Sequence, residues 1–388
     1  MKKNVYLSIL FMILGFSSFY AKAADYYRAY YHGLFTGQPT CARAAGMGLT
    51  TITLGGIENV VYNPASIGLE SQLVNVYLNY ATGDQISLGS KFGFFGASYR
   101  VNDKLVLGLS RQRWVEKDSP WTTIIGSFEE SVDKSSQLMY TLSGAYEVIP
   151  NLQVGLSGNY VVDKAVPGTV TSSEFIASLG IIYDMEVNWI KLKNLENQKI
   201  RFAGSFINLL MNNETTITYE EYMHYREIPS YVYLGTSYEG SLPFNPGFLS
   251  NSSFFSNAPQ EVDLKINLQY GNHLKYDYLT SFGIGAEALF MKMIAFRLGY
   301  YFEKRPERYE DNEDFWATTN KKGLTFGYGV KLPVKKLTND KIPFNVDVDM
   351  VTFKVLNELN TKNYTPPPIF TGHNFLFALG VKLKWVGK

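Results

Sequence analysis

Period-two alternation of apolar and polar residues, repeated from Gln72 to the C-terminus, is the feature that most constrains the fold of this chain. In the last such run, Phe375 and Phe377 share one strand face, while Lys382 and Lys384 lie on the other. The pattern predicts fourteen strands, near residues 72–81, 85–101, 104–116, 137–148, 152–165, 174–186, 199–210, 229–241, 261–271, 280–291, 293–303, 322–334, 342–354 and 373–386. Alternation of this kind is typical of an antiparallel sandwich or of a barrel.

The first 23 residues predict a secretory signal peptide. Lys2 and Lys3 precede the apolar run Val5–Phe19, and Ala21-Lys22-Ala23 has the spacing of a cleavage site. Beyond this leader, no apolar run reaches the ~18 residues that a transmembrane helix needs. If the exported chain lies in a membrane, it must therefore do so as a closed barrel, and fourteen is an even number, as such a barrel requires.

Composition agrees with a barrel and excludes some other classes. The net charge is +1, which does not suggest nucleic acid as a partner. Aromatic residues make up 15% of the chain, as aromatic girdles would require, and the mean hydropathy of −0.10 excludes a polytopic helical membrane protein. The single cysteine, Cys41, cannot form an internal disulfide.

The lengths of the predicted connections favour a barrel with both termini on the periplasmic side. Met291-Lys292-Met293 is short and falls on that side, whereas Met211–Ile228 is long, polar and on the opposite side. Two connections disagree with the alternation: Ala81–Asp84 is short where a loop is expected, and Leu242–Gln260 is long where a turn is expected. Either a strand is miscounted or Leu242–Gln260 is a periplasmic excursion.

Charges on the less apolar strand faces predict ion pairs inside a polar lumen. Opposite charges on neighbouring inward faces can pair there, whereas a Lys or Arg pointing into lipid would cost ~2–4 kcal/mol near the midplane. The charges expected in the lumen are Glu287, Arg297, Asp347, Asp349, Lys382 and Lys384.

The stretch Ala42–Leu69 is rich in glycine and small residues and carries almost no charge. Glycine permits positive φ and close backbone approach, while Pro64 fixes its own φ and makes Asn63 extended. We expect residues 24–71 to form a hatch, or plug, that fills the lumen of a barrel built from residues 72–388. The predicted hatch and gating residues are Gly46, Met47, Gly48, Gly55, Gly56, Glu58, Asn63, Pro64 and Ala65.

Two motifs resemble the start of the FadL superfamily of outer-membrane proteins: Arg43-Ala44-Ala45-Gly46-Met47-Gly48 and Tyr62-Asn63-Pro64-Ala65. The superfamily includes transporters of fatty acids and aromatic hydrocarbons, and the PorV and PorQ proteins of type IX secretion in Bacteroidota. The resemblance implies a fourteen-stranded barrel with a lumenal hatch. Family members commonly carry an acidic pair between the motifs, whereas this chain reads Gly55-Gly56-Ile57-Glu58-Asn59, where Glu58 alone could substitute.

The resulting hypothesis is an outer-membrane barrel of a Gram-negative bacterium, inserted in the lipid bilayer, that binds or passes hydrophobic compounds. One alternative is a PorV-type component of type IX secretion, whose partners would be a secreted protein's sorting domain or the translocon; the motif spacing looks closer to PorV-like members. A second alternative is a soluble secreted β-sandwich. Neither catalytic motifs nor metal-ligand spacing of the four histidines is present, so we expect no enzyme, no metal and no cofactor.

Overall fold

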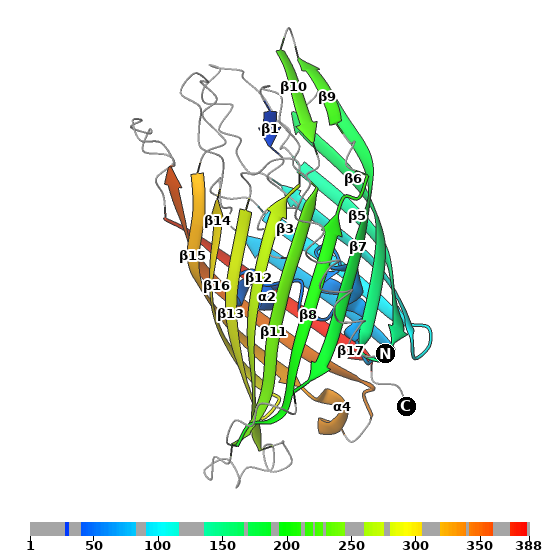
Figure 1. The fold of residues 1–388 in the computed structure, drawn as a ribbon, viewed down its shortest axis with the longest axis vertical. Helices are drawn as coiled ribbons and strands as arrows, with labels where there is room; N and C mark the ends of the chain where they lie inside the picture. The colour runs from blue at the N-terminus through cyan, green and yellow to red at the C-terminus, as the bar shows by residue number, and fades with distance from the viewer. Residues whose placement is uncertain are drawn as a thin grey trace, which may run out of the picture.

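Fourteen strands close into one antiparallel barrel in the computed structural model of this chain (Figure 1). The residues that the structure describes are 28–30, 40–82, 91–115, 136–166, 170–187, 194–210, 214–219, 222–227, 230–244, 260–274, 280–304, 319–338, 341–359 and 373–385. The predicted leader, residues 1–23, lies outside them. The barrel closes because the last strand pairs with the first, Leu379 lying opposite Tyr80.

The barrel strands follow one another in chain order around the wall, except that β8 is followed directly by β11. They are β2 (Val74–Thr82), β3 (Lys91–Arg100), β4 (Leu105–Val115), β5 (Ser136–Ile149), β6 (Leu152–Val166), β7 (Val170–Glu186), β8 (Glu196–Ile207), β11 (Tyr231–Pro243), β12 (Glu261–His273), β13 (Thr280–Phe290), β14 (Ile294–Lys304), β15 (Thr319–Leu332), β16 (Phe344–Leu359) and β17 (His373–Trp385). The predicted fourteen-stranded barrel is confirmed, and the soluble sandwich is wrong because the sheet has no open edge.

The two faces of the wall are inverted relative to a water-soluble protein. On β5, Leu142 is 67% exposed, whereas its neighbours Thr141 and Ser143 are buried. Leu109 on β4 and Leu156 on β6 are similarly exposed on the outside. Because apolar surface is unstable in water, a continuous apolar outer face of this kind is built for hydrocarbon.

Aromatic rings gather at the end of the barrel where β13 turns into β14. Phe290 and Phe296 make an edge contact with ring centroids 5.8 Å apart, and Phe296 makes another with Tyr328 at 6.4 Å. Phe244, just after β11, meets Phe290 at 5.4 Å. Rings in this position are typical of the aromatic girdle at a membrane–water interface.

The two connections that disagreed with the predicted alternation of lengths have different outcomes: the first is longer than predicted, and the second is long as predicted. The strand expected at 85–101 begins only at Lys91, so the connection from Thr82 is longer than the predicted Ala81–Asp84, and its residues 83–90 lie outside the described residues. The long connection Leu242–Gln260 joins β11 to β12 at the same end as the Met291 turn. It is therefore an excursion on the short-turn side rather than a miscounted strand.

A small sheet and a short helix lie outside the barrel wall. β9 (Glu214–Tyr219) and β10 (Tyr222–Glu227) form a hairpin within the predicted loop Met211–Ile228, and β1 (Arg28–Tyr30) pairs with β10 in parallel (Figure 1). Helix α4 (Val334–Leu337) follows β15. Among the described residues, no helix has the length and apolar character needed to cross a membrane.

Candidate functional site: the plugged lumen

Residues 40–70, here called the plug, lie inside the barrel. Their helix α2 (Ala42–Gly46) packs on β14 to β17, the 3-10 turn η2 (Ile57–Asn59) on β2 to β4, and the 3-10 turn η3 (Pro64–Leu69) on β4 to β7. Figure 1 shows α2 within the ring of strands. A segment that contacts opposite walls of a closed cylinder must cross its lumen. That residues 24–71 act as one movable hatch stays a prediction.

The residues between these short elements reach the remaining strands. The Thr53 carbonyl accepts a hydrogen bond of 2.9 Å from Arg201 on β8, and Thr51 N donates to Gln269 Oε1 on β12 at 2.7 Å. Backbone polar groups buried in a lumen need such partners, because no secondary structure satisfies them there. Side chains of the wall therefore supply the hydrogen-bond partners that the irregular plug backbone lacks.

The Gly46-Met47-Gly48 motif lies directly against the wall strands β14 and β15. Thr325 Oγ1 on β15 donates to the Gly46 carbonyl and accepts from Gly48 N, both at 3.0 Å. Gly48 has a φ of +66°, and a Cβ on Gly299 of β14 would lie 2.1 Å from Gly48 N. Both the plug and the wall therefore need glycine here, one for its backbone conformation and the other for space.

The Asn63-Pro64-Ala65 motif starts η3 and joins three parts of the molecule. Asn63 caps η3, with Oδ1 accepting from Ala65 N at 3.0 Å, and Pro64 occupies the first turn. Asn63 Nδ2 donates to the Ile52 carbonyl within the plug at 3.0 Å and to the Ile181 carbonyl of β7 at 3.4 Å. The side chain is completely buried, so these bonds are shielded from water.

The wall is hollowed where this motif rests. A Cβ on Gly180 of β7 would lie 2.0 Å from Asn63 Oδ1, and one on Gly155 of β6 would lie 2.3 Å from Ala65 N. Any larger residue at either inward position would push the motif out of its seat. The predicted gating residues thus meet glycines that alternation alone did not single out.

Gly55 and Gly56 connect the two 3-10 turns. Gly56 has a φ of +123°, its N–H donates to the Ser66 carbonyl at 3.0 Å, and its carbonyl accepts from Ser66 Oγ at 2.9 Å. Gly55 O accepts from Asn59 Nδ2 at 3.2 Å. These bonds hold η2 beside η3, so residues 55–66 form one compact turn.

The first ion-pair cluster joins α2 to the wall. Arg43 Nε donates to Glu287 Oε2 on β13 at 2.9 Å, and Arg297 Nε on β14 donates to the same oxygen at 2.6 Å. Arg297 Nη2 also lies 2.8 Å from Asp349 Oδ1 on β16. The predicted residues Glu287 and Arg297 therefore lie together and face the lumen, and Arg43 is the plug residue that they bind.

The second cluster joins the other side of the plug to β17. Lys382 Nζ lies 3.0 Å from both carboxylate oxygens of Glu58 and 2.6 Å from Glu70 Oε1. Lys384 pairs with Asp347 instead. Glu58 and Lys382 are thus brought together, whereas Asp347, which is opposite Lys382 in strand register, binds a different lysine.

A third cluster was not predicted. Arg201 forms two bonds of 2.6 and 2.8 Å with Asp184 on the neighbouring strand β7. Glu239 lies 2.6 Å from Lys265 and 3.3 Å from Lys199. The strand register brings these side chains together, because Asp184 lies opposite Arg201 and Glu239 lies opposite both Lys199 and Lys265.

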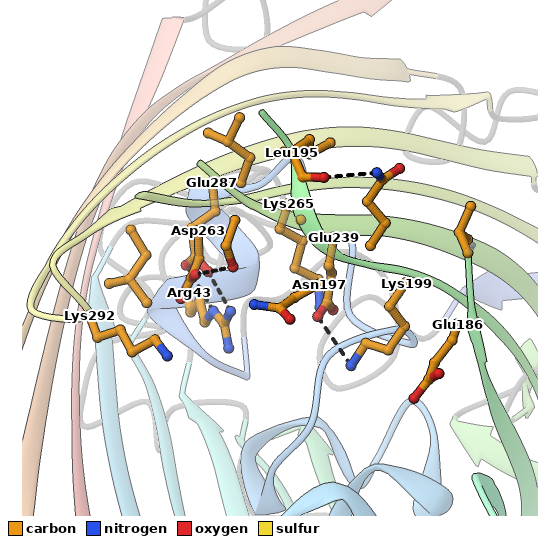
Figure 2. Close-up of a pocket in the computed structure, with 16 residues that line it drawn as sticks. Arg43, Glu186, Leu195, Asn197, Lys199, Glu239, Asp263, Lys265, Glu287 and Lys292 are labelled. Atoms are coloured by element: carbon orange, nitrogen blue, oxygen red, sulfur yellow. Dashed lines mark hydrogen bonds and ion pairs between the residues drawn. The ribbon is translucent and has the colours of Figure 1, made fainter. Parts of the chain in front are cut away.

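A cavity of about 740 Å³ lies beside the plug, at the end of the barrel that carries the short turns. Figure 2 shows Arg43, Glu239 and Lys265 directed toward it. Its charged lining consists of Arg43, Lys199, Lys265, Lys292, Glu186, Glu239, Asp263 and Glu287. A space lined with both signs of charge favours water and polar groups over apolar molecules.

Toward the loop end, the lumen is lined by aromatic and apolar side chains, with buried polar groups such as Gln112, Gln137 and Glu303 among them. Tyr62 of the plug meets Tyr233 of β11 edge-on at 5.9 Å, and Tyr231 stacks on Tyr233 at 5.6 Å. The buried wall residues that form one core with the plug include Tyr77, Ala81, Phe92, Phe94, Met139, Val161, Ile176, Ile207, Tyr231, Tyr233, Tyr301, Val351 and Ala378. The lumen therefore has aromatic and apolar side chains toward the loop end, and ion pairs where the plug meets the wall and in the cavity beyond it.

The partners that sequence reasoning missed are Arg43, Glu70 and the wall glycines. Arg43 and Glu70 flank the predicted motifs, and each is a charged residue in a segment with almost none, which was the available signal. Inward glycines at strand centres were a second signal, since a strand interior gains nothing from glycine unless another backbone approaches. In the part of the chain that the structure describes, no three His, Cys, Asp or Glu residues gather as metal ligands.

A closed barrel with an apolar outer face and a filled, charged lumen defines an outer-membrane β-barrel protein, because only a closed sheet satisfies its backbone in lipid. The fold is that of the FadL-like outer-membrane barrels. Its structure is similar to that of a FadL homologue from Pseudomonas aeruginosa, with 11% sequence identity and a TM-score of 0.50 over 92% of this chain and 99% of the other.

Two further solved structures are similar to the chain. They are the toluene transporter TbuX of Ralstonia pickettii (12% identity, TM-score 0.46, 89% of this chain and 98% of the other) and the toluene transporter TodX of Pseudomonas putida (10% identity, TM-score 0.44, 89% and 97%). No protein-family model and no curated protein matches the sequence. At such identities the likeness establishes the fold alone.

Proposed function

We propose that this protein binds hydrophobic compounds and passes them across the outer membrane, and that movement of the plug gates the passage. The observation that carries the proposal is the set of aromatic and apolar side chains at the loop end of the lumen, next to a plug that ion pairs join to the wall. The P. aeruginosa FadL homologue, which shares the fold, is consistent with this function.

The apolar part of the lumen is suited to hold the compound. Rings such as Phe92, Phe94 and Tyr233 are buried in the plugged structure. A compound that displaces the groups packed on them removes its own apolar surface from water, which is worth about 25 cal/mol per Å². The compound then meets Tyr62, which is adjacent to Asn63 in the plug. Contact with the compound is in this way transmitted to the residues that seat the plug on the wall.

The plug is suited to move because its ordered elements are short. Helix α2 has five residues, η2 has three and η3 has six. Elements of this length have little stability of their own and depend on the wall for their bonds. Rearrangement therefore requires the release of wall contacts rather than the unfolding of long elements. These contacts include the side-chain bonds of Asn63, Arg43 and Glu58 and the packing of buried apolar plug residues.

The test is uptake of 1-N-phenylnaphthylamine, which fluoresces in apolar surroundings, by cells that express the protein. Expression should accelerate uptake relative to cells with an empty vector. A variant lacking residues 46–65 should take up the dye at a different rate if its folded barrel, checked by heat-dependent gel mobility, still inserts. Unchanged uptake and unchanged dye binding in this variant would eliminate the gating proposal.

A second candidate is a role in protein secretion of the PorV type. The observation that favours it is the β1–β10–β9 sheet, which extends the structure beyond the wall at the loop end. The test is a pull-down from cells that contain the secretion system: recovery of a translocon subunit or a secreted sorting domain favours this role, whereas recovery of lipids or hydrocarbons alone counts against it.

A further inference from the structure

One lysine of the barrel wall holds two carboxylates of the plug. Lys382 Nζ lies within 3.0 Å of Glu58 and within 2.6 Å of Glu70. The side chains of Lys382, Glu58 and Glu70 are only 10%, 6% and 5% exposed. With both glutamates ionised, this buried cluster carries a net charge of −1.

The surrounding charged groups are engaged elsewhere. Among the described residues, Asp347 pairs with Lys384, and Asp349 pairs with Arg297. The Arg100 guanidinium at the rim of the plug donates to the backbone carbonyls of Gly68 and Glu70 rather than to a carboxylate. Within the part of the chain that the structure describes, Lys382 is therefore the one cation that binds these glutamates.

The other groups around the cluster are neutral. The Cys41 thiol of α2 lies near Glu58, and the Tyr77 hydroxyl of β2 accepts a hydrogen bond from Ala42 N. Ser98 Oγ of β3 donates to Glu70, and Ile57 N donates to Glu70 Oε1 at 3.4 Å. These donors ease the charge on Glu70, whereas the Glu58 carboxylate accepts bonds from Lys382 and from its own backbone N–H.

Two carboxylates that share one buried cation favour the uptake of a proton, as in other sites where like charges lie close together. Burial raises the pKa of Glu58, and the Glu70 carboxylate adds to this effect, while Lys382 opposes it. A proton on Glu58 relieves the repulsion between the two carboxylates, which bind the same Nζ of Lys382.

We propose that Glu58 binds one proton in the plugged protein, beside the Glu70 carboxylate, and that opening of the plug, which hydrates and separates the two carboxylates, releases this proton to water. The coupling to opening rests on the plug movement proposed above, whereas the proton site does not. The sign follows from linkage: the plugged state binds more protons, so acid stabilises it and opening becomes more favourable as pH rises. Release of one proton changes the opening equilibrium by up to about tenfold per pH unit.

Infrared spectroscopy of the purified barrel in detergent tests the proton site directly. The carbonyl band of a protonated carboxylic acid is expected at neutral pH in the parent protein. It should be absent from both the Glu58→Gln and the Glu70→Gln variants. It should be present in the control Glu147→Gln, because Glu147 is a half-buried carboxylate that accepts from Asn151 N at a turn. Absence of the band from the parent, or its persistence in both variants, would refute the proton site.

Reaction of Cys41 with 4,4′-dithiodipyridine, normalised to the unfolded protein at the same pH, tests the coupling. The parent rate should rise between pH 6 and pH 8, and the Glu58→Gln rate should be flat and slower than that of the parent at pH 8. An anchoring role alone predicts the opposite, because loss of an ion pair would speed the reaction. A carboxylic acid band together with pH-independent labelling would refute the coupling and count against gating, while leaving the proton site intact.

Discussion

Replacement of Asn63 by alanine tests the seat of the plug most directly. The side chain caps η3 through Ala65 N and donates to the carbonyls of Ile52 and Ile181. Asn63→Ala removes all three bonds, leaving the Ala65 N–H without its cap and the two carbonyls without this donor. Alanine keeps the Cβ of Asn63 and lacks only its amide group, so the substitution creates no new clash with Gly180.

The expected cost can be worked from these contacts. Loss of a helix cap costs about 1 kcal/mol, and each buried neutral hydrogen bond contributes about 1 kcal/mol, less for the long 3.4 Å contact to Ile181. A total of about 2–3 kcal/mol destabilises the plugged state relative to the open state, which corresponds to about a 30- to 150-fold change in the opening equilibrium.

Cys41 provides the assay because it is the single cysteine and is completely buried. Burial raises the pKa of its thiol to about 12, so it reacts slowly in the plugged state. Its Sγ contacts Asn59 Oδ1 at 3.5 Å, and displacement of the turn that contains Asn59 and Asn63 uncovers it. We expect Asn63→Ala to accelerate Cys41 labelling by about 30- to 150-fold, the same factor as the change in the opening equilibrium.

The matched control is Asn102→Ala. Asn102 caps an exposed turn by accepting from Lys104 N and Leu105 N, both at 2.9 Å, and makes no contact with the plug. Its labelling rate should equal that of the parent. If Asn63→Ala folds and labels within twofold of the parent, the seat assigned to Asn63 is incorrect.

The remaining predictions concern the wall. Glu287→Gln should loosen the plug and accelerate Cys41 labelling, and a double-mutant cycle with Arg43→Met should show coupling; additive effects would mean that the two side chains act independently. Gly180→Val should displace Asn63 and accelerate labelling without lowering the yield of folded barrel. Unchanged labelling would show that the wall accommodates the larger side chain without moving Asn63. Leu142→Arg on the outer face should cost ~2–4 kcal/mol of barrel stability in lipid, measured by urea unfolding in vesicles. Gln137→Arg on the inner face should cost less. Equal costs would contradict the assignment of faces.

Much of the candidate site followed from local patterns. The glycines of the first motif and Asn63 were predicted to matter because their backbone requirements are local, and the structure shows positive φ at Gly48 and Gly56 and a cap at Asn63. The choice of partners was less accessible. Lys382 was placed in the lumen from its strand face, but its binding to Glu58 depends on where the plug rests, which no strand pattern describes.

The sequence by itself determined which side of each strand faces outward, because side chains alternate with a period of two whatever the neighbouring strand. It also marked residues 42–69 as a stretch apart, since small residues and glycine replace alternation there. Only the tertiary structure decided which inward residues meet. Lys382 and Glu58 are 324 residues apart in the chain, and they touch because β17 closes on β2 and the plug folds back between them. Such contacts depend on the combined register of all the strands around the barrel, and a local sequence pattern does not specify that combination.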